Sequence, residues 1–349
     1  MRWENVNISS AAAWLGRFED VRTAVEQGRY GAEVAEAEGY LGVRVTDTGS
    51  PADMAVTAGR TALSRVPDQI PHVELLMHAS FGFQGIDYWS PAAYIEQRTV
   101  GGSASAMEVK QASTGGLAAL HLAAAHVTAG SPTSSVLVTT ADAYRLPVFE
   151  RYGSDDGVLR ADGASALVVT RQEGVARVLS TVLCGDTTHE GIHRGDEQWS
   201  DVAGSSGWPV DVRQRKQQYF DRTGLAGRDV GMTLIQGAQK ALHQALDEAG
   251  TRPDEIARFV FPNLGLPAQR MMYQWEANGI DESRTTWGWG RGVGHIAAGD
   301  QAAGLAHLLE TRAVRVGDRV VLCGTGSGFS FAAAVLEITA VPDWSVSSD

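Results

Sequence analysis

Ser113, in the segment Gln-Ala-Ser-Thr-Gly-Gly at 111–116, is the residue best placed for covalent chemistry. The segment SAMEVKQAS at 105–113 reads as a strand and leads into the apolar segment 114–130, which predicts a strand running directly into a buried helix. Backbone N–H groups and the helix dipole stabilise negative charge at such a junction, so the N–H group of Ser113 can hold an oxyanion. The same pattern is also typical of a serine that only caps a helix.

The glycine-rich segment at 288–300 contains His295 and, five residues later, Asp300. A neutral imidazole can accept the proton of a serine hydroxyl, and a carboxylate can fix the tautomer of that imidazole. Alternatively, Asp300 caps the next helix and His295 packs in the interior. The glycine spacing differs from the G-x-G-x-x-G pattern of dinucleotide-binding turns, which disfavours a nucleotide cofactor there.

A second glycine-rich segment at 323–329 lies between two apolar stretches. It predicts a tight turn whose backbone N–H groups, above all that of Ser327, supply a second donor to an oxyanion. A plain hairpin turn is the alternative. The sequence contains no G-x-S-x-G, which disfavours an α/β-hydrolase.

The bulk properties exclude several classes of protein. The net charge of −12 disfavours nucleic acid and anionic membranes as partners. Two cysteines, Cys184 and Cys323, are too few for a disulfide framework or a four-ligand zinc site. The start of the chain lacks a signal-peptide pattern, and no apolar run is long enough to span a bilayer. We therefore expect a cytoplasmic protein without a metal site.

Hydrophobic patterning predicts alternating strands and helices in two halves, and 349 residues suit two subdomains. The first half, 1–172, carries Ser113, and the second, 173–349, carries His295 and Asp300. We expect the strands at 165–172 and 175–185 to pair as a hairpin. The other strands are expected at 73–80, 105–113, 134–142, 257–263, 318–326 and 329–338, and the helices at 50–66, 114–130, 230–250, 266–279 and 299–314.

Together these segments resemble the ketoacyl-acyl-carrier-protein synthase III family. The resemblance rests on AMEVKQASTGGLAAL (106–120), RADGASALVV (160–169), GVGHIAAGD (292–300) and RVGDRVVLCGTGSGFSF (315–331). It implies an α/β, thiolase-like five-layer αβαβα fold with two pseudo-duplicated halves, an active site between the halves, and a homodimer. It implies no cofactor, because the acyl donor is itself a phosphopantetheine or coenzyme A thioester.

Three departures from the family pattern concern the catalytic residues. The family's nucleophilic cysteine falls on Ser113, its catalytic histidine near Pro262, and its asparagine on His295. Decarboxylative condensation depends on that histidine and asparagine. The chain is thus similar to the offshoot of antibiotic and polyketide pathways that transfers acyl or aryl groups from a carrier protein or coenzyme A to a hydroxyl, an amine or another carrier.

We therefore predict an acyltransferase that uses Ser113 as nucleophile, His295 as base and Asp300 to orient it, with the N–H groups of Ser113 and Ser327 as oxyanion hole. One alternative is a starter-unit ketoacyl synthase of an aromatic polyketide pathway, which would decarboxylate a malonyl thioester. Another is a non-catalytic partner subunit, which the presence of a base beside the serine disfavours.

The resemblance also implies substrate and partner residues. Residues 81–98 and the loop His189–Trp208 are expected to line the substrate pocket. Because carrier proteins are acidic, the basic cluster on a predicted helix is a candidate docking patch, and a solvated helix face is the alternative. The candidate pocket residues are Phe83, Tyr88, His193, Trp208 and Asn263, and the patch consists of Arg213, Arg215 and Lys216.

Overall fold

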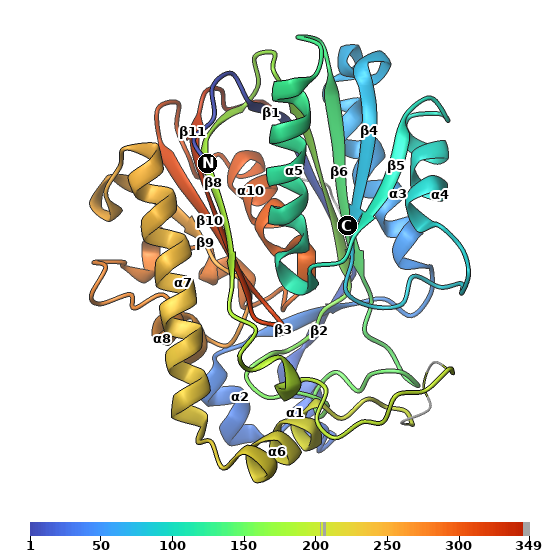
Figure 1. Cartoon of the computed structure of the whole chain (residues 1–349), viewed down its shortest axis with the longest axis vertical. Helices are drawn as coiled ribbons and strands as arrows, with labels where there is room; N and C mark the ends of the chain where they lie inside the picture. The colour runs from blue at the N-terminus through green and yellow to red at the C-terminus, as the bar shows by residue number, and fades with distance from the viewer. Residues whose placement is uncertain (203, 205–206, 345–349) are drawn as a thin grey trace.

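The computed structural model describes residues 1–202, 204 and 207–344. Over this part of the chain, one nine-stranded sheet has the order β5-β4-β6-β7-β1-β8-β11-β10-β9 (Figure 1). A two-stranded sheet pairs β2 (Arg17–Asp20) with β3 (Gly42–Val45). The strands of the large sheet are β1 (Asn7–Leu15), β4 (Val73–Ala79), β5 (Ser105–Val109), β6 (Ser135–Asp142), β7 (Gly163–Thr170), β8 (Ala176–Gly185), β9 (Ile256–Val260), β10 (Arg319–Gly326) and β11 (Ser330–Ile338).

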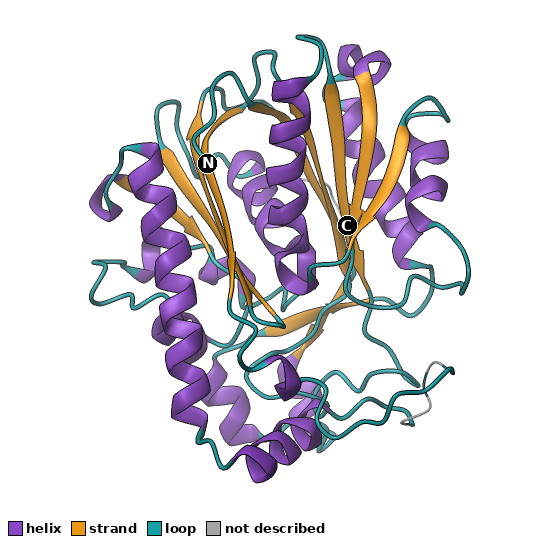
Figure 2. Cartoon of the chain, in the orientation of Figure 1, coloured by secondary structure: helices purple, strands orange, loops and turns teal. Residues whose placement is uncertain are grey.

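The large sheet has two arms with helices between and outside them, which makes five layers (Figures 1 and 2). Helices α5 (Gly115–Ala129) and α10 (Asp300–Glu310) lie between the arms and contact strands of both. Helices α3 (Pro51–Ser64) and α4 (Pro91–Thr99) cover one outer face. Helix α7 (Gly227–Ala249), with α8 (Leu266–Met272) packed on it, covers the other. This arrangement is the αβαβα order expected from the sequence.

Helix α5 is buried along most of its length, as its apolar composition predicts. Glycine at its first turn permits a close approach to the chain just before α10. A Cβ atom at Gly116 would lie 2.2 Å from the carbonyl oxygen of Ala298, closer than any side chain allows. The contact brings together two segments that are far apart in the sequence, and both lead to the site described below.

Two sequence predictions about elements are wrong. Strands β7 and β8 do not form a hairpin, because β1 lies between them and pairs antiparallel with both. Its Asn-Ile-Ser-Ser-Ala-Ala-Ala-Trp-Leu sequence has few β-branched residues, so it gave no strand signal. Helix α8 ends at Met272 instead of reaching residue 279, and Gln274 just beyond it has a φ of 45°.

The proposed boundary at 172/173 falls in the connection between β7 and β8. Strands β1 and β4–β7 form one side of the sheet and β8–β11 the other. The two sides are joined through the short β1–β8 pairing at Asn7 and Ile8. The division into two domains stays a prediction. Among the helices described, none combines the length and apolar character that a membrane span requires.

Candidate active site

Ser113 lies at the junction between β5 and α5, in a single 3-10 turn (Ala112–Thr114). Its neighbour Ala112 has a φ of 47°, a left-handed conformation that turns the chain sharply into the helix. The turn after β10 packs against this corner. A Cβ atom at Gly326 would lie 3.2 Å from the backbone nitrogen of Ser113, so glycine keeps space in front of that N–H group.

Ser113, His295 and Asp300 form one hydrogen-bonded chain. Ser113 Oγ lies 2.8 Å from His295 Nε2, and His295 Nδ1 lies 2.5 Å from Asp300 Oδ2. All three are buried, with exposed fractions of 5%, 2% and 0%. Because an ionised carboxylate only accepts hydrogen bonds, Nδ1 carries the proton in this contact and a neutral ring presents Nε2 as an acceptor to the serine hydroxyl.

Asp300 is held by backbone and side-chain donors in addition to the imidazole. Its Oδ2 accepts from the N–H group of Asn263 at 2.7 Å, and its Oδ1 accepts from Ile296 N–H at 2.9 Å. Asn263 Nδ2 lies 3.3 Å from Oδ1 and donates to the Gly294 carbonyl at 3.0 Å. These bonds fix the carboxylate that orients His295.

The backbone of His295 is anchored to the segment before β7. Its N–H group donates to the Leu159 carbonyl, and its own carbonyl accepts from Ala161 N–H, both at 2.9 Å. Gly294 precedes it with a φ of 80°, and a Cβ atom there would come within 3.0 Å of the Leu159 oxygen. Segments of both sequence halves therefore set the position of the imidazole.

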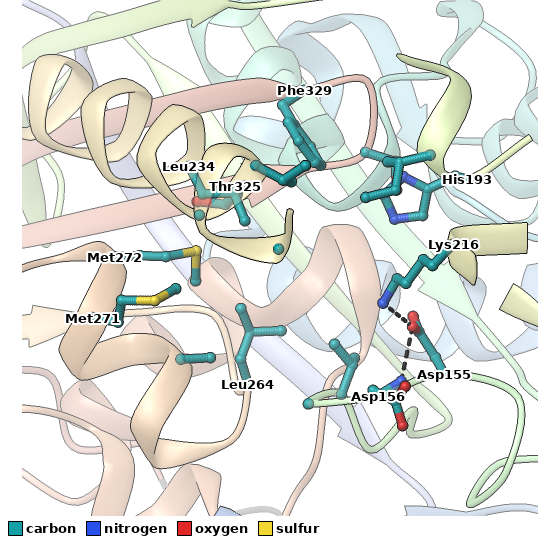
Figure 3. A pocket seen from close by; sticks show the side chains of 18 of the residues that line it. Asp155, Asp156, His193, Lys216, Leu234, Leu264, Met271, Met272, Thr325 and Phe329 are labelled. Atoms are coloured by element: carbon teal, nitrogen blue, oxygen red, sulfur yellow. Dashed lines mark hydrogen bonds and ion pairs between the residues drawn. The ribbon is translucent and has the colours of Figure 1, made fainter. Parts of the chain in front are cut away.

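Ser113 and His295 open onto a cavity of about 1010 Å³ (Figure 3). Ser327 also lines it, so both residues of the predicted oxyanion hole border the same cavity. Its far wall is apolar and comes from α7 and α8 with the turn before α8, through Leu234, Leu264, Met271 and Met272. A polar wall opposite consists of Asp155, Asp156, His193, Arg160 and Lys216.

The predicted pocket residues are only partly found at cavities. His193 lines the large cavity, and burial followed by the charge of Lys216 lowers its pKa to about 4, so its ring is neutral. Phe83 lines a second cavity of about 600 Å³. Tyr88 is fully exposed, and Trp208 is half exposed beside Gly204, so neither encloses a ligand in this chain. Residues 203, 205 and 206 of the predicted pocket loop lie outside the described residues.

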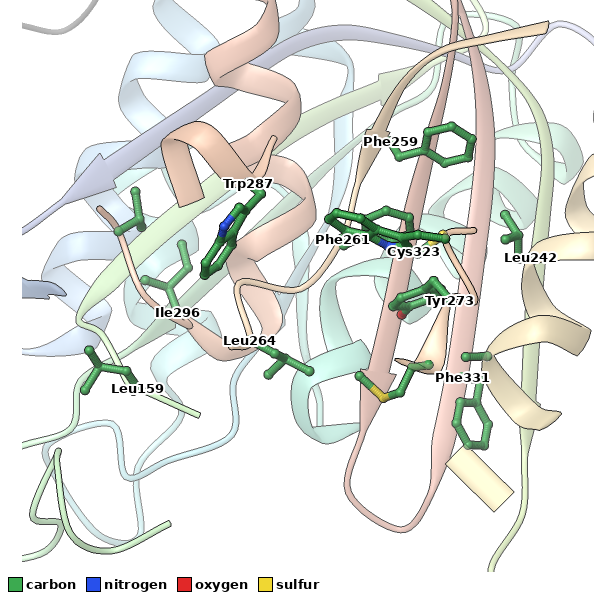
Figure 4. Close-up of a cluster of buried hydrophobic side chains, with 14 of the residues drawn as sticks. Leu159, Leu242, Phe259, Phe261, Leu264, Tyr273, Trp287, Ile296, Cys323 and Phe331 are labelled. Carbon is green, nitrogen blue, oxygen red and sulfur yellow. The ribbon is translucent and has the colours of Figure 1, made fainter. Parts of the chain in front are cut away.

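Asn263 is a correction to the predicted pocket, because it lies behind Asp300 and is 2% exposed. An aromatic stack next to it fixes the chain after β9 (Figure 4). The ring of Phe261 lies 5.7 Å from Phe259 and 4.4 Å from Tyr273, measured between centroids. The spacing of residues in the sequence does not indicate that Asn263 holds the Asp300 carboxylate, since the two residues meet only in the folded chain.

The predicted basic patch lies on α6 (Val212–Thr223), but the structure pairs each cation with a carboxylate. Arg213 lies 2.6 Å from Asp156, Arg215 lies 3.2 Å from Glu197, and Lys216 forms an ion pair with Asp155. Burial alone would raise the pKa of Asp155, but Lys216 and Arg160 outweigh it and lower that pKa, so the carboxylate is charged. The patch is therefore largely neutralised, and Lys216 belongs to the cavity wall.

A five-layered fold whose central helix begins beside a buried serine, at a cavity lined from both sequence halves, defines the thiolase-fold class. Residues 107–187 match the family model of 3-oxoacyl-[acyl-carrier-protein] synthase III, and residues 246–338 match the model of its C-terminal part. The chain belongs to this family, whose members are acyl-transferring enzymes.

Individual relatives agree with this assignment. The structure of ChlB3, described as an acyltransferase, is 31% identical, with a TM-score of 0.91 over 97% of this chain and 99% of that one. The β-ketoacyl synthase III of Mycobacterium tuberculosis is 28% identical over 62% of this chain, and the match spans 60% of the relative's length. A priming β-ketosynthase of a polyketide pathway shares the fold, with a TM-score of 0.80, 19% identity and 98% of each chain covered.

Proposed function

We propose that the protein is an acyltransferase that carries an acyl or aryl group on Ser113 Oγ. The donor is a carrier-protein or coenzyme A thioester, and the acceptor is a hydroxyl, an amine or a carrier thiol. The observation that carries the proposal is the buried chain of hydrogen bonds from Ser113 through His295 to Asp300. The similarity to ChlB3 over nearly the whole chain supports it.

In the first half-reaction, Ser113 Oγ attacks the thioester carbonyl while His295 Nε2 takes the hydroxyl proton. The N–H groups of Ser113 and Ser327 stabilise the oxyanion of the tetrahedral intermediate. When the intermediate collapses, the C–S bond breaks and the leaving thiolate receives the proton from the imidazolium. The product is an acyl-serine ester and a free thiol.

In the second half-reaction, the acceptor gives its proton to His295 Nε2 and attacks the ester carbonyl. The C–O bond to Ser113 then breaks, and the serine oxygen recovers the proton from the imidazolium. Asp300 stabilises the imidazolium in both halves through its bond to Nδ1. The thioester supplies the activated acyl group, so the proposed reaction uses no cofactor.

The presence of serine in place of the family's cysteine explains why a base is needed at this site. A serine hydroxyl has a far higher pKa than a thiol and is a weak nucleophile without an adjacent base. His295 occupies that place, where the family pattern has an asparagine. Condensation would instead require groups that steady an enolate, and the family's histidine position falls near Pro262.

Intact-protein mass spectrometry with a panel of acyl thioesters tests this function. The wild-type protein should gain the mass of one acyl group and lose it when an acceptor is added, without releasing carbon dioxide from malonyl-carrier protein. Ser113→Cys should still become acylated, because a thiol is intrinsically more nucleophilic. Malonyl decarboxylation by the wild type would favour the starter-unit synthase, and no acylation with any thioester would favour a non-catalytic subunit.

A further inference from the structure

Arg160 occupies the wall between two apolar-lined spaces. It lines both the 1010 Å³ cavity, with Ser113 and His295, and the second cavity of about 600 Å³. Its backbone forms a parallel bridge with His295. Its side chain is only 7% exposed, so it is an interior group placed beside the reacting residues.

The guanidinium of Arg160 is incompletely satisfied. Its Nη2 lies 3.4 Å from Asp155 Oδ2, and the Tyr144 hydroxyl is near enough to interact with the guanidinium, but Nε and Nη1 make no hydrogen bond of normal geometry to any described residue. The Nδ1 atom of His193 is also buried and makes no hydrogen bond to any of the residues described. His193 lines both cavities as well. Buried donors without acceptors are costly, particularly on a charged group, so these atoms point to an acceptor supplied by a ligand.

Arg160 shares its ion-pair partner with a second cation. Asp155, its ion-pair partner, also pairs with Lys216, so one carboxylate serves two cations. Asp142 lies near enough to interact with Arg160, but it is fully buried and its carboxyl accepts the N–H groups of Phe81 and Gly82. The site therefore favours an electron-rich oxygen in front of the guanidinium.

Aromatic rings surround the same guanidinium. Its central carbon lies 5.5 Å from the Phe81 ring centroid and 5.4 Å from that of Tyr144. Both rings line the second cavity, together with Phe83 and Phe149. A ligand group here would have apolar walls at its sides and hydrogen-bond donors at one end, which is how pockets fix the orientation of a small molecule.

We propose that Arg160 recognises an oxygen acceptor, hydroxyl, carbonyl or carboxylate, on the acyl group that is delivered to Ser113. The inference rests on the proposed acyl-Ser113 function and adds the substrate class to it. The body of the acyl group would lie among the aromatic walls, and its oxygen would accept from Nε and Nη1. Arg160 is then a residue that determines specificity and touches the substrate.

The test uses coenzyme A thioesters that differ only in the acceptor. Benzoyl is compared with the 2-, 3- and 4-hydroxybenzoyl isomers, and butanoyl with succinyl, so that neutral and anionic oxygens are separated. The rate constant for acyl-enzyme formation is followed by intact-protein mass spectrometry. At least one oxygen-bearing member should react about ten- to a hundredfold faster than its partner, the range for a hydrogen bond to a buried charged group.

Arg160→Met keeps an unbranched side chain along the arginine stem and removes the donors, and Lys216 still has Asp155 as its ion-pair partner. The preference for the oxygen-bearing thioester over its unsubstituted partner should fall to about one. Arg65→Met is the control, because Arg65 is equally buried but bonded to Glu310 and the Ala11 carbonyl. It should keep the preference even if it lowers the melting temperature.

The outcomes separate the two proposals. If the benzoyl and butanoyl pairs all acylate Ser113 without preference, or if Arg160→Met keeps the preference, the inference about Arg160 is wrong and the acyltransferase function stands. If none of the thioesters acylates Ser113, the proposed function fails and the inference fails with it. A melting temperature of Arg160→Met close to that of the wild type confirms that lost preference is not lost folding.

Discussion

Asp300 is the residue on which the geometry of the site depends most. It receives four hydrogen bonds, from His295, Ile296 and twice from Asn263, and none of its surface is exposed. Asp300→Asn keeps its shape but replaces one acceptor oxygen with a donor, which faces other donors or forces the wrong tautomer on His295. We expect acyl-enzyme formation to slow by about 10²- to 10⁴-fold.

Quench-flow mass spectrometry with one reactive thioester measures this rate, and circular dichroism confirms that the variant is folded. A folded Asp300→Asn protein that acylates at the wild-type rate would show that the carboxylate has no part in the chemistry.

Asp142 gives a prediction about stability and pH. Burial raises its pKa to about 7, although hydrogen bonds from the N–H groups of Gly82 and Phe81 partly lower it. An unfolded-chain aspartate has a pKa of about 3.9, so between these values the folded protein binds more protons than the unfolded chain. The free energy of unfolding that this group contributes is therefore full below pH 4 and is lost as the pH rises through about 7.

Asp142→Asn removes this titration and keeps an acceptor for the two N–H groups. The wild-type free energy of unfolding, minus that of the variant, should fall by about 2–3 kcal/mol between pH 5 and pH 8. The slope should be about 1.4 kcal/mol for each pH unit up to about pH 7 and should flatten above it. Urea denaturation at the two pH values measures it. A difference that stays constant or rises with pH would mean that Asp142 is ionised throughout.

At the scale of elements, the first turn of α5 and the chain before α10 set the distance between Ser113 and His295. Gly116→Ala would place a methyl group 2.2 Å from the Ala298 oxygen, and the two segments must separate. We expect a loss of about 1–3 kcal/mol of stability and slower acylation of Ser113. Gly288→Ala on α9 (Trp287–Gly290) is the control, because its Cβ would meet nothing within 4 Å.

Thermal melting and the acylation rate are measured on both variants. The proposed packing would be contradicted if Gly116→Ala behaved like Gly288→Ala in both measurements.

The sequence predicted those elements whose signals are local. Apolar runs identified α5, α7 and most strands, and glycine-flanked segments identified Ser113, His295 and Asp300. Strand β1 was not predicted, because its sequence consists largely of alanine and serine. Pairing with neighbouring strands, and not intrinsic propensity, keeps it extended. The contact of Asn263 with Asp300 and the position of Arg160 beside the cavity were not predicted, because both depend on segments that only the folded chain brings together.

At the scale of the whole molecule, the three cations of the predicted carrier-protein surface have different surroundings and should contribute differently to binding. Arg213 and Arg215 lie on α6 and are paired with Asp156 and Glu197, whereas Lys216 faces the cavity. We predict that Arg213→Glu with Arg215→Glu slows acylation from an acyl carrier protein several-fold more than acylation from a small thioester, and that this difference grows at low salt.

Lys216→Glu should slow acylation from both donors, because it places a third carboxylate beside Asp155 and Asp156 at the cavity. Stopped-time acylation assays with the two donors at two salt concentrations measure these effects. Equal slowing of both donors by the double charge reversal would show that the carrier protein binds elsewhere.

The homodimer implied by the family also stays a prediction. Strand β5 lies at one edge of the large sheet.

The central claim is that Ser113 carries the acyl group and that His295 activates the Ser113 hydroxyl. The most direct measurement digests the acyl-enzyme, maps the added mass by peptide mass spectrometry, and compares the acylation rates of wild type, Ser113→Ala and His295→Ala. The acyl group should lie on Ser113, be absent from Ser113→Ala, and form about 10³-fold more slowly or worse in His295→Ala. Acylation of another residue, or acylation of His295→Ala at the wild-type rate, would contradict the account.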